Sequence, residues 1–304
     1  MFHAIIVVQL CCTTIFIRRK NMAFLTVNFI SKSLMRTVPV NVILPADKLT
    51  FPGQPEPEQK PYKCLILLHG ILGNYTDWVN GTRLQRLAEA KNLCVVMPSG
   101  DNAFYLDFPE AGNYYGKFIG EELPAMMRKM FHISDKREDM FIGGLSMGGF
   151  GSMRNGLKYN DTFGYITTLS GAFILREPDP DKEDEEIGAM GLEKYCFGTM
   201  KQGWYSDKNP QYIAKELADR KAAGEDVNFP KIYMCCGTED GLLGANHTVR
   251  DDLISKGFDV TYEEGPGGHE WNFWDTYIEK ILNWLPLDSD NAGINSGNVG
   301  KPED

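Results

Sequence analysis

The stretch that decides the fold is Met140-Phe141-Ile142-Gly143-Gly144-Leu145-Ser146-Met147-Gly148-Gly149, a short apolar run that leads into the pattern Gly-x-Ser-x-Gly. A tight turn between a buried strand and a helix leaves no room for side chains beside it, which explains the glycines at 144 and 148. Such a turn holds Ser146 in a strained backbone conformation and directs its hydroxyl out of the sheet. The N-terminus of the following helix favours negative charge that develops there. The stretch therefore predicts a nucleophilic serine between a strand and a helix.

Short apolar runs alternate with helical patterns on both sides of this turn. The runs, which are typical of strands covered on both faces, span residues 64–68, 93–97, 140–142, 165–169, 232–236 and, less regularly, 260–262. The helical patterns span residues 77–90, 117–131, 148–158, 211–222, 247–256 and 271–285. This alternation predicts an α/β fold with a mostly parallel central sheet and helices on both faces. Residues 26–31 and 38–44 alternate apolar with polar side chains, as strands of an antiparallel edge do.

One domain is expected over residues 22–287, with an additional segment at each end. Residues 1–21 are interpreted as a dispensable extension, because their apolar run is shorter than the roughly 20 residues of a membrane-spanning helix. Their basic residues also follow the apolar run, whereas a secretory signal has them first. A weak membrane anchor is the alternative. Residues 288–304, rich in Asp, Asn, Gly and Ser, are expected to form a disordered tail.

An irregular segment at about residues 170–209 interrupts the alternation of strands and helices. It contains the acidic run from Glu177 to Glu186. We interpret the segment as a short cap insertion at the mouth of a pocket, and a solvated surface loop is the alternative.

The composition is that of a globular protein with a full-sized core. The chain has 304 residues, of which 43% are hydrophobic and 24% charged, and this excludes a disordered chain or a disulfide-dense mini-domain. Its formal charge of -10 provides no electrostatic attraction for nucleic acid. The seven cysteines are an odd number and lie mostly in apolar runs, which predicts reduced, buried thiols and a cytoplasmic protein. No cysteine spacing is typical of a zinc site, so neither a metal nor another cofactor is expected.

A serine hydroxyl needs a base to become a good nucleophile, and elimination among the five histidines selects His269. It lies in the loop Gly265-Pro266-Gly267-Gly268-His269, after the last predicted strand. The others lie in the N-terminal extension, at a helix end, in a strand-to-loop turn and at a helix start; they are His3, His132, His69 and His247. A histidine on a flexible loop can approach a serine at another strand end. A structural role at a helix start is the alternative for His269.

The carboxylate partner is expected in the loop Gly237-Thr238-Glu239-Asp240-Gly241, which follows the penultimate strand. Asp240 is the preferred candidate, with Glu239 expected to point to solvent. The order Ser146, Asp240, His269 is the chain order of α/β-hydrolase triads.

Backbone N–H groups are expected to form an oxyanion hole. The stretch Leu67-Leu68-His69-Gly70-Ile71-Leu72-Gly73 ends an early strand in a glycine-bearing loop. The N–H of Ile71 and the N–H of Met147 together could hold the oxyanion of a tetrahedral intermediate. A plain turn at a strand end is the alternative.

The chain resembles the esterase D/tributyrin esterase branch of the α/β-hydrolases, which is related to feruloyl and acetyl-xylan esterases of carbohydrate esterase family one. The resemblance rests on His69-Gly70-Ile71-Leu72-Gly73-Asn74, on Gly144 to Gly149 and on His269-Glu270-Trp271 with Trp274, and it covers about residues 22–287. It implies that the matched Ser, Asp and His are the triad. The chain has Leu169-Ser170-Gly171-Ala172 in place of the Phe-Ala-Pro phrase of S-formylglutathione hydrolases, which argues against glutathione thioesters.

The function predicted from these observations is that of a serine carboxylesterase acting through an acyl-enzyme on a small-molecule ester. By resemblance, the substrates are short-chain acyl or hydroxycinnamoyl (feruloyl-type) esters. A thioesterase or an acyltransferase is the alternative, and a non-catalytic binding protein is a more distant one. A homo-oligomer is compatible with the sequence. The candidates for contact with the substrate, for which core packing is an equal alternative, are Trp204, Trp271, Trp274, Phe104 and Tyr105.

Overall fold

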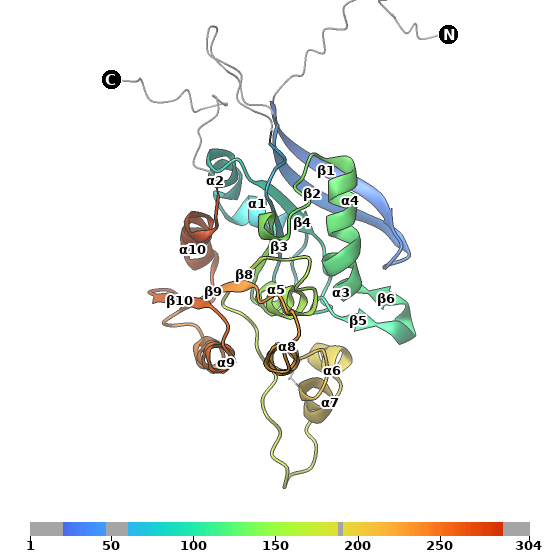
Figure 1. The fold of residues 1–304 in the computed structure, drawn as a ribbon, viewed down its shortest axis with the longest axis vertical. Helices are drawn as coiled ribbons and strands as arrows, with labels where there is room; N and C mark the ends of the chain where they lie inside the picture. The colour runs from blue at the N-terminus through green and yellow to red at the C-terminus, as the bar shows by residue number, and fades with distance from the viewer. Residues whose placement is uncertain (1–20, 47–59, 188–190, 288–304) are drawn as a thin grey trace, which may run out of the picture.

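The computed structural model describes residues 21–46, 60–187 and 191–287. The predicted N-terminal extension, apart from Asn21, and the predicted tail at 288–304 lie outside these residues. Figure 1 shows the described chain coloured from its N-terminus to its C-terminus.

The described residues form an eight-stranded sheet with the order β1-β2-β4-β3-β7-β8-β9-β10 (Figure 1). The pairs β1/β2 and β2/β4 are antiparallel, and all other neighbours are parallel. The mostly parallel sheet and its antiparallel edge are thus confirmed. The strands are β1 (Asn21–Ser31), β2 (Arg36–Ala46), β3 (Cys64–Leu68), β4 (Cys94–Pro98), β7 (Met140–Leu145), β8 (Tyr165–Leu169), β9 (Lys231–Gly237) and β10 (Val260–Gly265). The short strands β5 (Asp107–Phe108) and β6 (Asn113–Tyr114) pair separately.

Helices cover both faces of the sheet. The α-helices are α1 (Asp77–Gly81), α2 (Leu84–Ala90), α3 (Tyr115–Lys117), α4 (Leu123–Met130), α5 (Met147–Lys158), α6 (Leu192–Phe197), α7 (Met200–Trp204), α8 (Pro210–Ala222), α9 (Leu243–Ser255) and α10 (Trp271–Trp284). A π-helical segment, Phe118–Glu122, joins α3 to α4, and two 3₁₀ turns span Pro109–Ala111 and Arg137–Asp139. No helix in the described ranges is long and apolar enough to cross a membrane.

Alternate side chains of each central strand enter two separate cores. In β3, Cys64, Ile66 and Leu68 join the larger core, which contains side chains of α4, α5, α8 and α9. Leu65 and Leu67 join the smaller core, with side chains of α1, α2 and α10. This period of two follows from the geometry of a strand. In Figure 1, α2 and α10 accordingly lie on the opposite side of the sheet from α4.

The helical pattern at residues 77–90 proved to be two helices instead of one. Thr82 has an extended backbone, with φ -143° and ψ 171°, and separates α1 from α2. Its hydroxyl oxygen accepts a hydrogen bond at 3.1 Å from the N–H of Leu84, the first residue of the second helix. A Cβ on Gly81, the last residue of α1, would lie 2.5 Å from the ring of Trp271, so the glycine allows α10 to pack closely against the end of this helix. Sequence periodicity does not register such a contact between distant segments.

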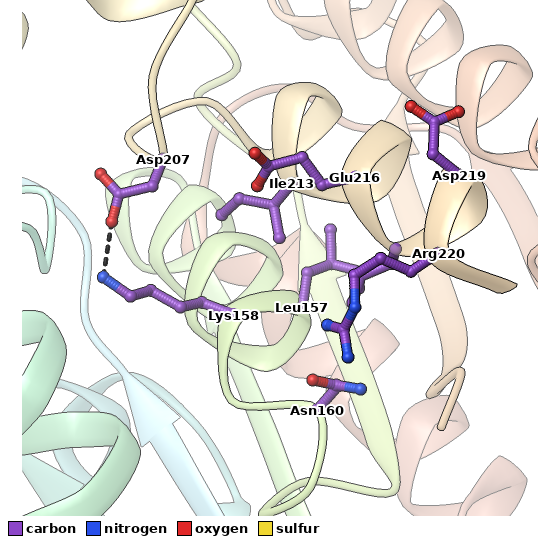
Figure 2. A pocket seen from close by; sticks show the side chains of 9 residues that line it. Leu157, Lys158, Asn160, Asp207, Ile213, Glu216, Asp219 and Arg220 are labelled. Carbon is purple, nitrogen blue, oxygen red and sulfur yellow. Dashed lines mark hydrogen bonds and ion pairs between the residues drawn. The ribbon is translucent and has the colours of Figure 1, made fainter. Parts of the chain in front are cut away.

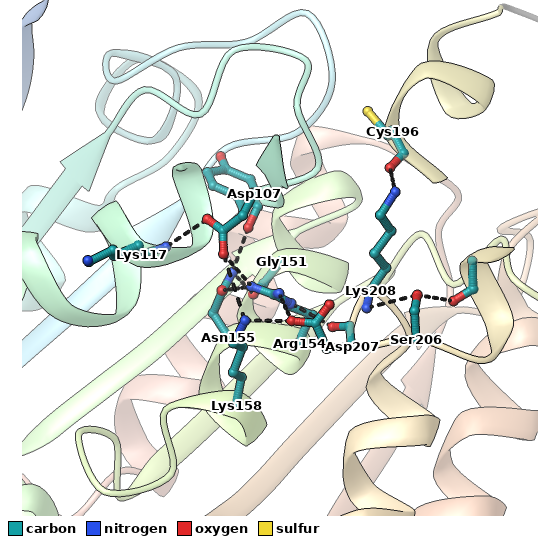
Figure 3. A network of polar contacts seen from close by, with 12 residues as sticks. Asp107, Lys117, Gly151, Arg154, Asn155, Lys158, Cys196, Ser206, Asp207 and Lys208 are labelled. Atoms are coloured by element: carbon teal, nitrogen blue, oxygen red, sulfur yellow. Dashed lines mark hydrogen bonds and ion pairs between the residues drawn. The ribbon is translucent and has the colours of Figure 1, made fainter. Parts of the chain in front are cut away.

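The predicted insertion at residues 170–209 contains α6 and α7 and is attached to α5 by a buried arginine (Figure 3). Arg154 is 1% exposed, and its Nε and Nη2 donate to the backbone oxygen and the carboxylate of Asp207 at 2.9 and 2.8 Å. Asp207 also pairs with Lys158. A buried guanidinium needs such partners, since an unpaired buried charge is costly. These contacts therefore hold the C-terminal end of the insertion against the central helix.

The turn between β7 and α5 depends on two glycines. A Cβ at Gly144 would lie 2.4 Å from the backbone oxygen of Gly148, and one at Gly148 would lie 2.4 Å from the backbone oxygen of Leu68. Because backbone atoms cannot move aside as side chains do, neither position accepts a larger residue without a shift of the strand or the helix. The predicted reason for these glycines is confirmed.

We expect Gly144→Ala to lower the free energy of unfolding by about 1–3 kcal/mol, because the added methyl group overpacks the turn. Urea unfolding followed by tryptophan fluorescence measures the change. Gly244→Ala in α9 is the control: nothing lies within 4 Å of its added Cβ. This variant should be at least as stable as the wild type, because alanine has a higher helix propensity than glycine. A Gly144→Ala variant as stable as the wild type would contradict the role of the glycine.

Candidate active site

The structure brings Ser146, Asp240 and His269 together at the carboxyl ends of three strands. Ser146 follows β7, Asp240 follows β9, and His269 lies between β10 and α10. The imidazole Nε2 of His269 is 2.9 Å from the Ser146 Oγ, and its Nδ1 is 2.9 Å from the Asp240 Oδ2. Both distances are those of hydrogen bonds. The arrangement can transfer a proton from the serine hydroxyl to the imidazole while the carboxylate orients the ring.

Ser146 has the strained backbone conformation that its turn requires. Its φ of 53° and ψ of -118° lie in a region that residues other than glycine rarely adopt. Two backbone hydrogen bonds hold it there: its N–H donates to the Leu169 oxygen, and its own oxygen accepts from the Ala172 N–H, both at 2.9 Å. Strain of this kind persists only where the surroundings enforce it.

Asp240 is a buried carboxylate with several hydrogen-bond donors. Its side chain is 1% exposed, whereas the His269 side chain is 37% exposed. Burial alone would raise the pKa of Asp240, but the Leu242 N–H, the Ser170 hydroxyl and the His269 ring together lower it below its ordinary value. The carboxyl group is therefore ionised at neutral pH and can stabilise an imidazolium.

Glu239, the other acid of this loop, is exposed as expected and also contacts the loop that carries His269. Its Oε2 accepts a hydrogen bond from the Gly267 N–H at 3.1 Å, and its own N–H donates to the Gly267 oxygen. Glu239 thereby connects the carboxylate loop to the loop that carries His269.

The residues whose N–H groups are expected to form the oxyanion hole both belong to segments next to Ser146. Met147 is the first residue of α5, so its N–H has no acceptor within that helix. The loop that carries Ile71 is close to the serine, since a Cβ on the preceding Gly70 would lie 3.5 Å from the Ser146 Cβ. Within the described residues the Ile71 N–H donates to no other backbone group. Both groups are thus free to bind a ligand oxygen.

His69, which the sequence analysis set aside, controls the orientation of this loop. Its Nε2 accepts from the Gly100 N–H at 2.9 Å, so the neutral ring carries its proton on Nδ1 and donates it to the Gly70 oxygen at 2.6 Å. Burial lowers the pKa of His69, consistent with a neutral ring. Because the Gly70 carbonyl and the Ile71 N–H belong to one rigid peptide unit, this bond also sets the direction of that N–H. The signal available in the sequence was the pair His69-Gly70 itself.

The five candidate substrate-contact aromatics have different roles in the structure. Phe104 and Tyr105 lie in the core and are 3% and 0% exposed, so their assignment to a substrate pocket is corrected. The Phe104 ring packs against Phe150 and Phe197. The Tyr105 hydroxyl donates to the His69 backbone oxygen at 2.9 Å and so supports the same loop. Both side chains therefore belong to the larger core.

The three tryptophan rings, like Phe104 and Tyr105, pack against other side chains of the chain. The Trp274 ring lies edge to face against His269, with the ring centroids 5.0 Å apart. Trp271 packs against Trp78 and Trp274, and Trp204 packs against the larger core. Of the five aromatic side chains, only Trp274 has a ring contact with a member of the triad.

A groove of about 480 Å³ lies away from the triad, between α5 and α8 (Figure 2). It is lined by Leu157 and Lys158 at the C-terminal end of α5 and by residues of α8 such as Ile213 and Arg220. At 1.5 Å per helical residue, Leu157 is about 17 Å along α5 from Ser146. The groove is therefore separate from the site. No group of three or more His, Cys, Asp or Glu side chains that could hold a metal occurs in the part of the chain that is described.

The chain is similar to known esterases and serine hydrolases. The Esterase family model, described as "Putative esterase", matches residues 31–285. An acetyl esterase of Caldicellulosiruptor saccharolyticus is 40% identical over 271 residues, which are 88% of this chain and 100% of that protein. The substrate-bound structure of the fluorophosphonate-binding serine hydrolase FphF of Staphylococcus aureus is 28% identical, with a TM-score of 0.72 and coverage of 88% of this chain and 99% of that one. The S-formylglutathione hydrolase FrmB of the same organism is 28% identical, with a TM-score of 0.71 and coverage of 87% and 98%.

We expect His69→Leu to slow the labelling of Ser146 by a fluorophosphonate probe about ten-fold or more, because the Gly70 oxygen then keeps only its 3.3 Å hydrogen bond from the Gly73 N–H and the Ile71 N–H is directed at the oxyanion less firmly. His69→Asn is the matched variant. Its amide can still donate to the Gly70 oxygen from near the Nδ1 position. The labelling rate of His69→Asn should therefore fall less than that of His69→Leu. Equal labelling rates for the wild type and His69→Leu would show that the loop keeps its orientation without the imidazole.

Proposed function

The chain belongs to the esterase family and is a carboxylic ester hydrolase with the α/β-hydrolase fold, and we propose that it hydrolyses short-chain acyl esters, acetyl esters above all, through an acyl-enzyme on Ser146. The observation that carries the proposal is the continuous hydrogen-bonded series from the Asp240 carboxylate through His269 to the Ser146 hydroxyl. Support for acetyl esters comes from the relative named acetyl esterase, to which this chain is 40% identical over the full length of that protein.

In the first half of the reaction, the Ser146 Oγ attacks the ester carbonyl carbon while the His269 Nε2 takes the hydroxyl proton. The resulting oxyanion binds the N–H groups of Ile71 and Met147, each of which contributes on the order of 3 kcal/mol to the stability of the transition state. The intermediate then breaks the bond between the carbonyl carbon and the leaving oxygen. His269 gives its proton to that oxygen, and the alcohol leaves.

In the second half, water takes the place of the alcohol. His269 removes a proton from the water as it attacks the acyl carbon, and the proton returns to the Ser146 Oγ when the acid is released. The 37% exposure of the His269 side chain leaves room for this water, while the buried Asp240 keeps the imidazolium stable in both steps. This chemistry needs only side chains and backbone groups of the chain.

The proposal includes a cytoplasmic location. The five cysteines in the described ranges, Cys64, Cys94, Cys196, Cys235 and Cys236, are free and buried. Free thiols are typical of a reducing compartment.

The variant Ser146→Ala tests the nucleophile. We expect it to lose p-nitrophenyl acetate hydrolysis by at least 10⁴-fold, because removing the nucleophile removes the acyl-enzyme route. Its unfolding curve should match that of the wild type. The backbone of residue 146 is held by hydrogen bonds to the backbones of Leu169 and Ala172, which the substitution leaves in place. Mass spectrometry of the wild type during turnover should detect an acetyl group on Ser146. Activity close to the wild-type value in Ser146→Ala would remove the mechanism.

The acyl specificity is tested by comparing kcat/KM for acetate, butyrate and methyl ferulate esters and for S-formylglutathione. We expect acetate to be the best ester, with methyl ferulate slower. The thioester is a second candidate substrate because the chain is 28% identical to an S-formylglutathione hydrolase over 87% of its length. The sequence Leu169-Ser170-Gly171-Ala172 argues against it. A kcat/KM for the thioester above that for acetate would replace the proposed substrate class.

A further inference from the structure

Ser170, at the carboxyl end of β8, has a strained and fully buried position next to the triad. Its φ is 48°, and it is 0% exposed. Its N–H donates to the Cys235 oxygen in β9 at 2.8 Å. A serine gains nothing from this backbone conformation, which glycine would adopt at lower cost. The side chain must therefore be what the position requires.

The hydroxyl of Ser170 lies among three polar groups. The Trp274 Nε1 donates to its oxygen at 3.3 Å. The hydroxyl also faces the Asp240 carboxylate and the Cys236 thiol. Mainly because it is buried, the Cys236 thiol has a pKa raised to about 12, so this group stays neutral. The carboxylate is the one charged acceptor of the three.

The chemistry of these groups decides where the Ser170 proton points. An indole N–H can only donate, and an ionised carboxylate can only accept. Trp274 therefore uses a lone pair of the Ser170 oxygen and leaves the hydroxyl proton for Asp240. The groups therefore follow one another in the order Trp274, Ser170, Asp240, His269 and Ser146. The Trp274 N–H donates to Ser170, the Ser170 hydroxyl faces Asp240, and the Asp240 Oδ2 accepts from the His269 ring, which contacts Ser146.

Asn246 of α9 holds the two loops of this series together. Its side chain is buried, with its Oδ1 accepting from the Gly171 N–H at 3.1 Å and its Nδ2 donating to the Gly171 oxygen at 3.0 Å. The same Nδ2 is 2.9 Å from the Leu242 oxygen, and the Leu242 N–H donates to the Asp240 Oδ1. The loop after β8 and the loop after β9 are thereby fixed relative to each other.

We propose that Ser170 is a positioning residue of the reaction: its hydroxyl, oriented by the Trp274 indole, holds the Asp240 carboxylate with Oδ2 toward His269. The inference rests on the proposed function, since it concerns the same triad. The Leu242 N–H occupies Oδ1 and His269 occupies Oδ2, so the Ser170 hydroxyl supplies a further donor that a buried carboxylate needs. Without it the carboxylate can rotate away from the imidazole.

The experiment compares Ser170→Ala with Ser170→Gly, which both remove the hydroxyl. Glycine also removes the backbone strain, so the Gly variant should fold at least as stably as the Ala variant. We expect kcat for p-nitrophenyl acetate to fall about ten-fold in both, with KM nearly unchanged, because the lost contact acts on the transition state. Ser152→Ala is the matched control: Ser152 is also 0% exposed, and its Oγ is 2.9 Å from the backbone oxygens of Gly149 and Thr167.

A double-mutant cycle tests the role of Trp274. Trp274→Phe removes the indole N–H but keeps an aromatic ring near His269, so its effect on kcat should be smaller than that of Ser170→Ala. If the indole acts through the hydroxyl, Trp274→Phe should cause no further loss in the Ser170→Ala background.

Two results would overturn the inference: a wild-type kcat in either Ser170 variant, or an equal loss of kcat in Ser152→Ala. The labelling rate with a fluorophosphonate probe keeps this test independent of the substrate, because the probe reacts with Ser146 without an ester being hydrolysed. A wild-type chain that is labelled but hydrolyses none of the esters would contradict the proposed function. Slower labelling of Ser170→Ala and Ser170→Gly, with unchanged labelling of Ser152→Ala, would still support the positioning role.

Discussion

The tight turn at Ser146 is the constraint on which the rest of the structure depends. A left-handed serine is stable only when neighbouring groups hold it, and here the end of β8 does so through Leu169 and Ala172. The same contacts bring Ser170 close to the site. On the other side, Gly148 allows α5 to lie directly against the end of β3, which carries the loop of Ile71. One turn therefore determines how the nucleophile and the oxyanion loop lie relative to each other.

The electrostatics of the site divide between a buried and an exposed group. Asp240 is enclosed and surrounded by donors, which keeps it ionised despite its burial. His269 lies on a loop that is more open to solvent, where water can reach its ring. This division suits a reaction in which the carboxylate keeps its charge throughout while the imidazole gains and loses a proton twice. Glu239 connects the loops that carry the two groups and limits their relative movement.

The central helix α5 carries the site at one end and a polar network at the other. Its N-terminus follows Ser146, whereas Arg154 and Lys158 near its C-terminus bind Asp207 of the insertion (Figure 3). The helix is buried along almost its whole length. A rigid element of this kind suits the nucleophile proposed at Ser146, because attack on a carbonyl requires a fixed hydroxyl position. The insertion is thus attached to the same helix that positions the nucleophile.

The sequence by itself determined the alternation of the central strands and helices, the turn at Ser146 and the selection of Asp240 and His269 as its candidate partners, because periodicity, glycine spacing and chain order are local or linear properties. Only the tertiary structure decided the surroundings of these residues. Phe104 and Tyr105 proved to be core residues, His69 proved to contact the Gly70 carbonyl, and Ser170 proved to face Asp240. Such roles arise from contacts between segments far apart in the chain, and the same residue types occur in cores and in sites. Burial and hydrogen-bond direction distinguish a core residue from a site residue, and both exist only once the chain has folded.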